Sequence, residues 1–290
     1  MSIEETTKRI DALKAELATM RPLPPSALAV LREKRDLQLT HTSNAIEGNT
    51  LTLRETAEVI AYGTTIKGKP IKHHLEAQDH HAALEWMYAV ASGEEPIGVS
   101  TLLQLHKLVL KHSAPDIAGA WAVLPRGIQG TSISFPPAFE VEGLTRDFTD
   151  SLKTAEITPR HAFDAHYRLV SIHPFDDGNG RTARLLMNLM LVRGGYQPVP
   201  VSPDDRIEYL DSLERAQKGG GTDAYQELMH RLLLTTMEEY AGTLREAIHP
   251  EKDKQLTSSP GRKADDEEPG QILPTPAQIA AMHHRRGTGR

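Results

Sequence analysis

The residues with the clearest chemical potential lie in one stretch of the chain, HPFDDGNGRTAR, between His173 and Arg184. Gly178 and Gly180 stand just before an apolar segment that is typical of a buried helix. Glycines let a backbone turn sharply and present its N–H groups without obstruction from side chains. The unpaired N–H groups and the positive dipole end of the following helix would add to them. The stretch therefore predicts a cradle for an anion, most naturally a phosphate group.

Charged side chains surround this predicted cradle. Arg181 and Arg184 lie three residues apart, so both can point along one helix face toward a bound anion. Asp177 offers a hard oxygen ligand, as Mg²⁺ that bridges phosphates requires. His173, which precedes a proline, can accept a proton near neutral pH. Any one of these features is typical of an ordinary helix start, but together they predict a site for phosphoryl or nucleotidyl transfer.

The elements that must hold this stretch in place are predicted to be helices. Ile10, Leu13 and Leu17 recur at spacings of three and four, which indicates an amphipathic helix. Thr52 and Glu55 have the spacing of a capping box, so a helix should follow Thr52. By the same criteria the sequence predicts helices at 4–20, 26–46, 53–61, 71–92, 100–112, 143–155, 159–172, 181–194, 204–217 and 222–246.

Two segments depart from this helical pattern. Between Gly119 and Val141, short apolar pieces are punctuated by glycine and proline, which favours a β-hairpin or an extended flap. After Pro250 the chain is polar, charged and punctuated by proline and glycine, as linkers and disordered tails are. The sequence therefore predicts an all-α domain with one β-hairpin flap, followed by a tail.

One predicted helix is crowded with histidines. It carries His73, His74, Asp79, His80 and His81, and two of the histidine pairs are seven residues apart. Such spacing makes a metal site conceivable. The better interpretation is a polar helix face.

Composition bounds the class of protein. The chain has 290 residues, of which 39% are hydrophobic and 25% charged, so it can bury a core of domain size. It has no cysteine, which excludes disulfides, zinc fingers and thiol catalysis. The net charge of −6 gives no indication of a polybasic surface for nucleic acid or membrane. Because no apolar run is long enough for a membrane span or a signal peptide, we expect a cytoplasmic protein.

The stretch from His173 to Arg184 resembles the HPFxxGNGRxxR signature of the Fic (Fic/DOC) family at all eight specified positions. The resemblance extends over about residues 30–245 and implies the family's all-α helical bundle with one β-hairpin flap. It implies that the protein binds Mg²⁺ with ATP and transfers AMP to a Ser, Thr or Tyr hydroxyl of a target protein. His173 would then be the general base, and Asp177 would hold Mg²⁺. The ATP- and phosphate-binding set implied by the resemblance is Asp177, Gly178, Asn179, Gly180, Arg181 and Arg184.

A second motif, SNAIEG, resembles the family's inhibitory (S/T)xxxE(G/N) sequence and spans Ser43, Glu47 and Gly48. A carboxylate at the end of that helix can form a bidentate pair with Arg184. A paired Arg184 could not hold the γ-phosphate of ATP, so intrinsic activity would be low. In some relatives the same glutamate helps water to remove AMP. We expect N-terminal helices with the inhibitory segment at 1–50, a Fic catalytic domain at 51–247 and a tail at 248–290.

The resemblance also implies residues around the target and the adenine. Fic proteins hold a target segment on their flap by main-chain pairing, a form of strand addition. The candidate is 127–137, and its working edge would be Thr131, Ser132, Ile133 and Ser134. Tyr209 and Gln217 fall near the positions where relatives contact adenine.

Alternatives to AMP transfer remain open. One is a Fic enzyme that removes AMP or transfers another group, such as UMP, phosphocholine or phosphate. Another is a catalytically silent regulatory binding protein, although it would have no use for a base at His173. The partners expected are ATP and a target protein, with self-association a further possibility and no membrane or nucleic-acid partner.

Overall fold

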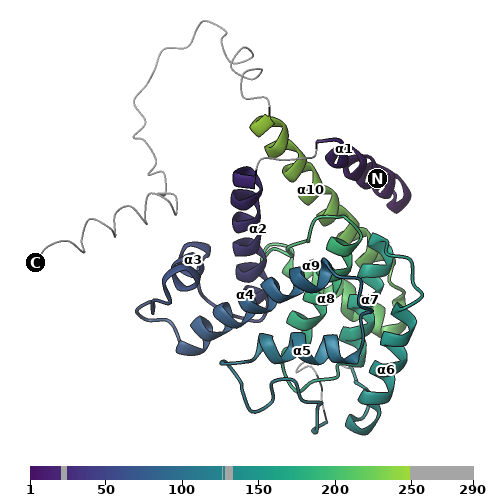
Figure 1. Ribbon diagram of the computed structural model, residues 1–290. Helices are drawn as coiled ribbons and strands as arrows, with labels where there is room; N and C mark the ends of the chain where they lie inside the picture. Colours follow the sequence, from purple (N-terminus) through teal and green to yellow (C-terminus); the bar gives the residue numbers. More distant parts are fainter. Residues whose placement is uncertain (21–24, 126, 128–132, 249–290) are drawn as a thin grey trace, which may run out of the picture. The chain divides into compact units, whose positions relative to one another are not determined.

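The computed structural model describes residues 1–20, 25–125, 127 and 133–248, and most of them lie in helices (Figure 1). The helices are α1 (Ile3–Thr19), α2 (Pro25–Ile46), α3 (Leu53–Tyr62), α4 (Ile71–Ala91), α5 (Val99–Val109), α6 (Val141–Leu152), α7 (Pro159–Ile172), α8 (Asn179–Arg193), α9 (Arg206–Arg215) and α10 (Asp223–Ile248). A 3₁₀ turn, η1 (Ala138–Glu140), precedes α6, and a π-helical turn, η2 (Ala216–Gly220), follows α9. Each helix predicted from the sequence is present, so the all-α class is confirmed.

The helix starts follow local sequence chemistry. Thr52 and Glu55 form the capping box that the spacing predicts, because each side chain bonds the other residue's backbone N–H. In α7 the Thr158 side chain accepts from the backbone N–H of His161, and Pro159 occupies the first helical position. These short-range bonds satisfy backbone groups that the helices themselves leave unpaired.

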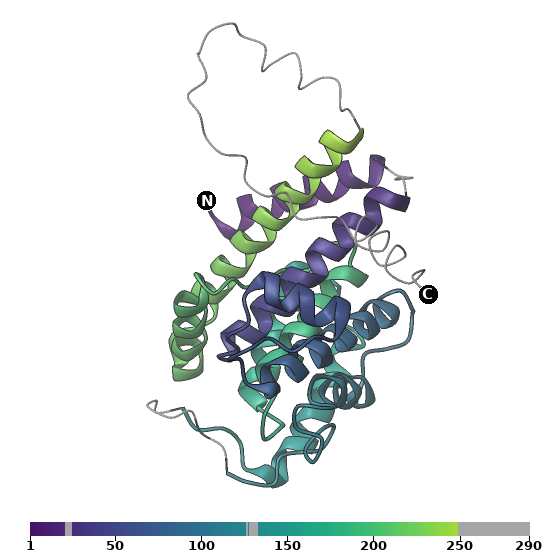
Figure 2. The same ribbon diagram turned by 90° about the vertical axis from the view of Figure 1, so that its left-hand side faces the viewer.

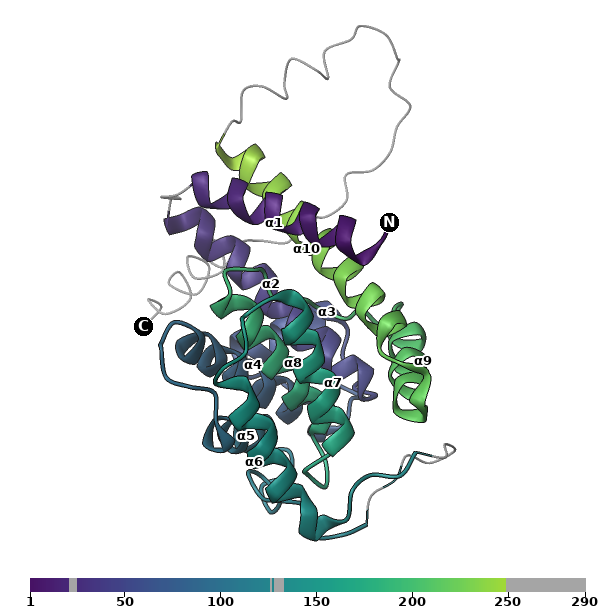
Figure 3. The ribbon, with the colours of Figure 1, turned by 90° about the vertical axis from the view of Figure 1, so that its right-hand side faces the viewer.

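Helix α8 is the central element of the fold, and α4, α5 and α7 pack around it (Figures 1 and 3). Residues 185–191 of α8 are almost completely buried, including its polar Asn188. A helix that is covered on all sides has no freedom to shift without disturbing its neighbours. The N-terminus of α8, which carries Gly180, Arg181 and Arg184, is therefore held rigidly.

Helix α1 lies along α10 at one side of the bundle (Figures 2 and 3). Ile10, Leu13 and Leu17 are buried in this contact region, as their spacing predicts. Two cross-helix ion pairs join Arg9 to Glu238 at 2.7 Å and Arg245 to Glu16 at 2.7 Å. Since these charges are largely exposed and such pairs add little, burial of the apolar side chains stabilises the contact.

The polar face predicted for the histidine-rich helix α4 is largely buried in the fold. His74, Asp79 and His80 are buried, because α4 packs against α2, α3, α5 and α8 at once. The Asp79 carboxylate accepts from the backbone N–H groups of His112 and Ser113 at 2.9 and 2.8 Å. Asp79 thereby binds the turn after α5. No group of three or more His, Asp or Glu side chains suited to a metal ion occurs among the described residues.

The predicted flap is seen only in part. Gly127 and Ser134 form an isolated antiparallel bridge, and Thr131 and Ser132 lie outside the described residues, so a β-hairpin is not confirmed. The predicted tail at 248–290 lies outside them too, apart from Ile248. Within the described part of the chain, no helix combines the length and apolar character needed to cross a membrane.

Candidate active site

His173 lies at the junction between α7 and the loop that leads to α8. It ends α7 in the left-handed conformation, with φ of 53°, and its N–H bonds the carbonyl of Leu169. The ring Nδ1 lies 3.2 Å from the carbonyl oxygen of Val170. Because a carbonyl can only accept, Nδ1 carries the proton and Nε2 keeps its lone pair. The ring stacks on Phe135 at 3.8 Å between centroids, which fixes its plane.

Asn179 closes the loop between α7 and α8. Its Oδ1 accepts from the N–H of Phe175 at 3.0 Å, and its Nδ2 donates to the Phe175 carbonyl at 2.7 Å. Asn179 is the first residue of α8 and is 3% exposed. Both polar ends of its side chain are thus used to hold the loop, and any contact with an anion would come from its backbone N–H.

His106 on α5 supports the same loop, and sequence reasoning missed it. The N–H of Gly119 donates to its Nδ1 at 3.0 Å, and its Nε2 lies 2.9 Å from the Asp177 carbonyl oxygen. Burial lowers the pKa of His106 to about 4, so the ring is neutral and Nε2 donates to that carbonyl. Phe175 stacks on the same ring at 3.8 Å. A leucine-rich helix with a single histidine carries no local signal of this role.

Gly178 needs to be glycine for two reasons. Its φ is +77°, a conformation that side chains disfavour. A Cβ there would also lie 3.2 Å from the His106 ring. The backbone N–H of Thr182 donates to the Gly178 carbonyl, and it is the first N–H of α8 that has an acceptor within the helix. The N–H groups of 179–181 are those that a helix start offers to an anion.

A cluster of charged side chains stands beside this helix start. Arg181 Nη2 lies 3.2 Å from Asp177 Oδ1, and Arg181 Nη1 lies 3.5 Å from Glu76 Oε1. Lys72 Nζ lies 3.9 Å from Asp177 Oδ2. The Asp177 side chain is 43% exposed, whereas Arg181 is 2% exposed. A half-exposed carboxylate beside a row of N–H groups fits Mg²⁺ that bridges phosphates. Glu76 and Lys72 were not predicted from the sequence.

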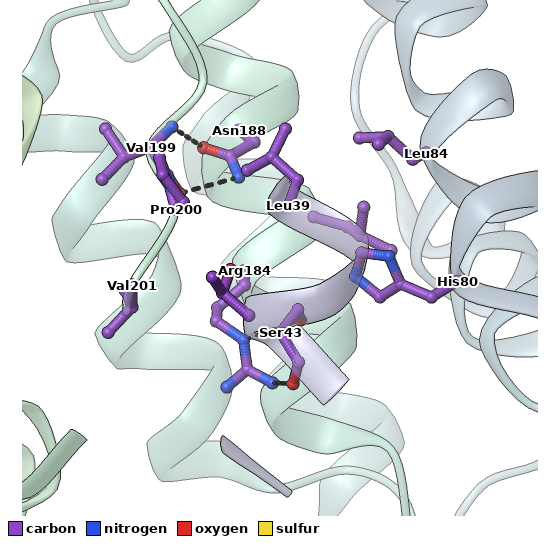
Figure 4. A pocket seen from close by; sticks show the side chains of 11 residues that line it. Leu39, Ser43, His80, Leu84, Arg184, Asn188, Val199, Pro200 and Val201 are labelled. Carbon is purple, nitrogen blue, oxygen red and sulfur yellow. Dashed lines mark hydrogen bonds between the residues drawn. The ribbon is translucent and has the colours of Figure 1, made fainter. Parts of the chain in front are cut away.

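Arg184 is buried against the end of α2. Its Nε donates to Ser43 Oγ at 3.0 Å, and its Nη2 donates to the Ser43 carbonyl at 2.9 Å and to Glu47 Oε1 at 2.8 Å (Figure 4 draws the Ser43 pair). The contact expected between Glu47 and Arg184 is present, but only one carboxylate oxygen takes part, so the pair is not bidentate. Burial by itself lowers the pKa of Arg184, but Glu47 and the neighbouring Tyr209 together outweigh burial and leave that pKa raised.

Two glycines shape this contact. Gly48, with φ of +93°, follows Glu47 and turns the chain away after α2. At Gly180, a Cβ would lie 2.5 Å from Glu47 Oε1 and 3.0 Å from Arg184 Nη1. The glycine at 180 thus leaves space for the carboxylate to reach Arg184.

The remaining predicted residues are more scattered. Tyr209 is 1% exposed and its hydroxyl lies 2.7 Å from His166 Nε2, so an adenine contact there would require α9 to move. Gln217 is half-buried on η2, and Ser134 is exposed close to the His173 stack on Phe135. Their roles stay predictions.

We expect Asn179→Ala to lower the free energy of unfolding by about 2–4 kcal/mol, because it removes two buried hydrogen bonds and leaves the backbone N–H and carbonyl of Phe175 without their partners. Asn188 is a matched control, since it makes the same two bonds with Val199 at 2.8 and 3.3 Å (Figure 4). Urea unfolding should give similar losses for Asn179→Ala and Asn188→Ala. Nucleotide affinity should fall only in Asn179→Ala. An equal fall in Asn188→Ala would mean that the two Asn179 hydrogen bonds to Phe175 have no specific role in nucleotide binding.

Comparison with known proteins places this site in a family. The Fic/DOC family model matches residues 96–191, which include the whole α7–α8 loop. The protein adenylyltransferase Fic of Nematostella vectensis is 32% identical over 270 residues, 90% of this chain and 61% of the relative. Protein adenylyltransferase fic-1 of Caenorhabditis elegans is 38% identical over 196 residues, 66% of this chain and 38% of the relative. The chain therefore spans less than two thirds of these relatives.

Solved structures agree with the sequence matches. Fic-1 from C. elegans superposes with a TM-score of 0.75 and 30% identity, over 84% of this chain and 73% of that one. A Fic family protein from Desulfovibrio desulfuricans superposes with a TM-score of 0.66 and 26% identity, over 88% and 76% of the two chains. With its helix order, its loop and its sequence all matched, the chain belongs to the Fic/DOC family.

Proposed function

We propose that this protein is a protein adenylyltransferase, which transfers AMP from ATP to a hydroxyl of a target protein, and that Glu47 restrains it. The observation that carries the proposal is the start of α8, which presents backbone N–H groups beside Asp177 and Arg181 at the end of the loop that His173 opens. The names of the C. elegans and N. vectensis relatives support this chemistry.

The proposed reaction breaks one P–O bond and forms another. The target hydroxyl oxygen attacks the α-phosphorus of ATP, the bond to the bridging oxygen of the β-phosphate breaks, and pyrophosphate leaves. His173 Nε2 takes the hydroxyl proton, because its Nδ1 already donates to the Val170 carbonyl. The N–H groups at the start of α8 would stabilise the charge that develops on the phosphate oxygens. When bound at Asp177, Mg²⁺ would neutralise phosphate charge.

Arg184 gives this site its proposed restraint. A guanidinium that is engaged by Glu47 and Ser43 cannot also present the same N–H groups to a γ-phosphate. ATP that lacks this contact would have its α-phosphate poorly aligned for attack. Glu47 lies at the end of α2 and Arg184 lies in α8. The restraint therefore ends only when the end of α2 moves away from Arg184.

A labelling experiment distinguishes AMP transfer from phosphate transfer. The Glu47→Gly protein is incubated with Mg²⁺ and with ATP that is radioactive at either the α- or the γ-phosphate. We expect covalent label on protein from the α-position only, accompanied by release of pyrophosphate. Label from the γ-position would indicate phosphoryl transfer, and neither label nor pyrophosphate would contradict the proposal. Competition by unlabelled GTP, UTP and CTP would identify the preferred base.

A further inference from the structure

Glu76 is a carboxylate of α4 that lies buried beside the charged cluster at the start of α8. It is 7% exposed. Its Oε2 accepts from Asn49 Nδ2 at 2.9 Å, and its Oε1 forms an ion pair with Arg181 Nη1 at 3.5 Å. A buried carboxylate is costly unless it is paired with a charge and hydrogen-bonded. Glu76 meets both conditions, one through each oxygen, because it lies between the segment after α2 and the start of α8.

Asn49 fixes the position of the Glu76 carboxylate. Its Nδ2 also donates to the His73 carbonyl at 2.9 Å, and its Oδ1 accepts from the backbone N–H of Leu51 at 3.0 Å. Asn49 is itself buried. Since both ends of its amide are bound to backbone groups, the side chain has one orientation. Asn49 thus holds Glu76 Oε2 in place, and this leaves Oε1 to face Arg181.

The Arg181 guanidinium lies between two carboxylates. Nη1 faces Glu76, and Nη2 donates to Asp177 Oδ1 at 3.2 Å. Because the guanidinium is planar and always charged, acceptors at two of its nitrogens fix its orientation. Lys72 Nζ lies 3.7 Å from Glu76 and 3.9 Å from Asp177, and its side chain is 54% exposed. Solvent weakens such exposed pairs, so the buried Arg181 is the main link between the two carboxylates.

The two carboxylate oxygens of Asp177 have different partners. Oδ1 accepts from the N–H of Gly178 at 2.6 Å and from Arg181. Among the described residues, Oδ2 has only the 3.9 Å ion pair with Lys72, which is too long for a hydrogen bond. Arg181 therefore holds one oxygen and leaves the other available. Without Glu76, Asp177 would have to balance the buried Arg181 charge, and Arg181 would compete with a cation for that carboxylate.

We propose that Glu76 is a positioning residue that holds Arg181 and balances its charge, and so keeps Asp177 Oδ2 available to Mg²⁺. This inference rests on the proposed function, in which Asp177 holds Mg²⁺. Glu76 touches neither the metal nor the nucleotide and acts through Arg181. The affinity of the site for Mg²⁺ then depends on a carboxylate of α4 and on Asn49, the residue that holds it.

The test measures how much Mg²⁺ strengthens ATP binding in the Glu47→Gly protein. Titration calorimetry gives the ATP affinity with Mg²⁺ and with EDTA, and the ratio of the two affinities is the gain from the metal. Glu76→Gln should lower this ratio on the order of tenfold, because a negative charge is lost and Arg181 then pairs with Asp177 alone. A residue that only supports the fold would weaken ATP binding equally in both conditions and leave the ratio unchanged.

Matched variants separate the position of the carboxylate from its charge. Asn49→Ala keeps every charge but releases Glu76 Oε2, and it should lower the ratio about threefold. Asn44→Ala removes a nearby buried amide that donates to the carbonyls of Thr40 and Glu76 at 3.0 and 3.3 Å, and it should leave the ratio unchanged. Glu85→Gln removes a charge from an exposed position of α4 and should also leave it unchanged. Thermal unfolding identifies any variant that does not fold, and Asn49→Ala still decides the question if Glu76→Gln fails.

The parent protein and its variants test different statements. In the parent, Mg²⁺ should strengthen ATP binding, and Asp177→Asn should abolish that gain. If either result fails, the metal role of Asp177 in the proposed function is wrong, and the inference is overturned with it. If both hold but Asn49→Ala keeps the ratio of the parent, the proposed function stands and the positioning role of Glu76 is overturned. Equal weakening by Glu76→Gln with Mg²⁺ and with EDTA also overturns the positioning role.

Discussion

Replacing Glu47 by glycine is expected to raise the initial rate of AMP labelling by between about tenfold and a hundredfold. The carboxylate accepts a charge-assisted hydrogen bond from the buried Arg184 at 2.8 Å, and such bonds are worth about 1.5–3 kcal/mol. Removing it frees the guanidinium for the γ-phosphate of ATP. Glu47 stands just after the last residue of α2, so glycine there costs the helix little.

The rate should be measured with α-labelled ATP on the wild-type protein and two graded variants. Glu47→Gln keeps an acceptor but loses the charge, so its rate should lie between those of wild type and Glu47→Gly. Glu33 lies at an exposed position within α2 and has no contact with Arg184, so Glu33→Gly removes another glutamate and should not activate. Labelling by Glu47→Gly that is equal to or slower than wild type would contradict the restraint.

The second large effect concerns His173. In the Glu47→Gly protein, His173→Ala should lower the labelling rate by about 10²–10⁴, the usual contribution of a general base. The ring Nε2 carries the lone pair that would take the hydroxyl proton. ATP affinity should hardly change, because the proposed phosphate contacts come from Arg184 and from the N–H groups at the start of α8 rather than from the His173 ring.

Backbone strain must be separated from chemistry in this experiment. His173 has φ of 53°, a conformation that alanine disfavours and asparagine tolerates. His173→Asn should therefore fold at least as well as His173→Ala and be equally inactive. If His173→Asn kept most of the rate, the histidine would serve the loop conformation, and the role of general base would be wrong.

Prediction from sequence succeeded where the cause is local. Thr52 and Glu55 form their capping box within four residues, and Ile10, Leu13 and Leu17 are buried as their spacing requires. It gave no indication for α4 that the polar His80 and Asp79 are buried. Helix α4 is enclosed by several other helices, so its sequence does not show a single apolar face. The spacing of its apolar residues therefore could not show which of its side chains are buried. A cytoplasmic location, self-association and the flap remain predictions.

The sequence alone determined the chemical parts of the site. The glycines, Asp177 and the two arginines lie within one turn-and-helix segment, so their types and spacing already predict an anion cradle with charged groups around it. The Ser43–Glu47 motif likewise indicated a carboxylate at the end of a helix. Both predictions, the anion cradle before one helix and the carboxylate at the end of another, depend only on local geometry at a helix terminus.

Only the tertiary structure decided which groups those parts contact. Arg184 meets Ser43 and Glu47 across 141 and 137 positions of sequence, and His106 supports the Asp177 carbonyl across 71. His166 and Tyr209 join 43 positions apart, inside the bundle. Such contacts depend on how helices pack side by side, and a buried polar group accepts whichever partner that packing supplies. For this reason His106 and His166 carried no signal in the sequence, although Arg184 did.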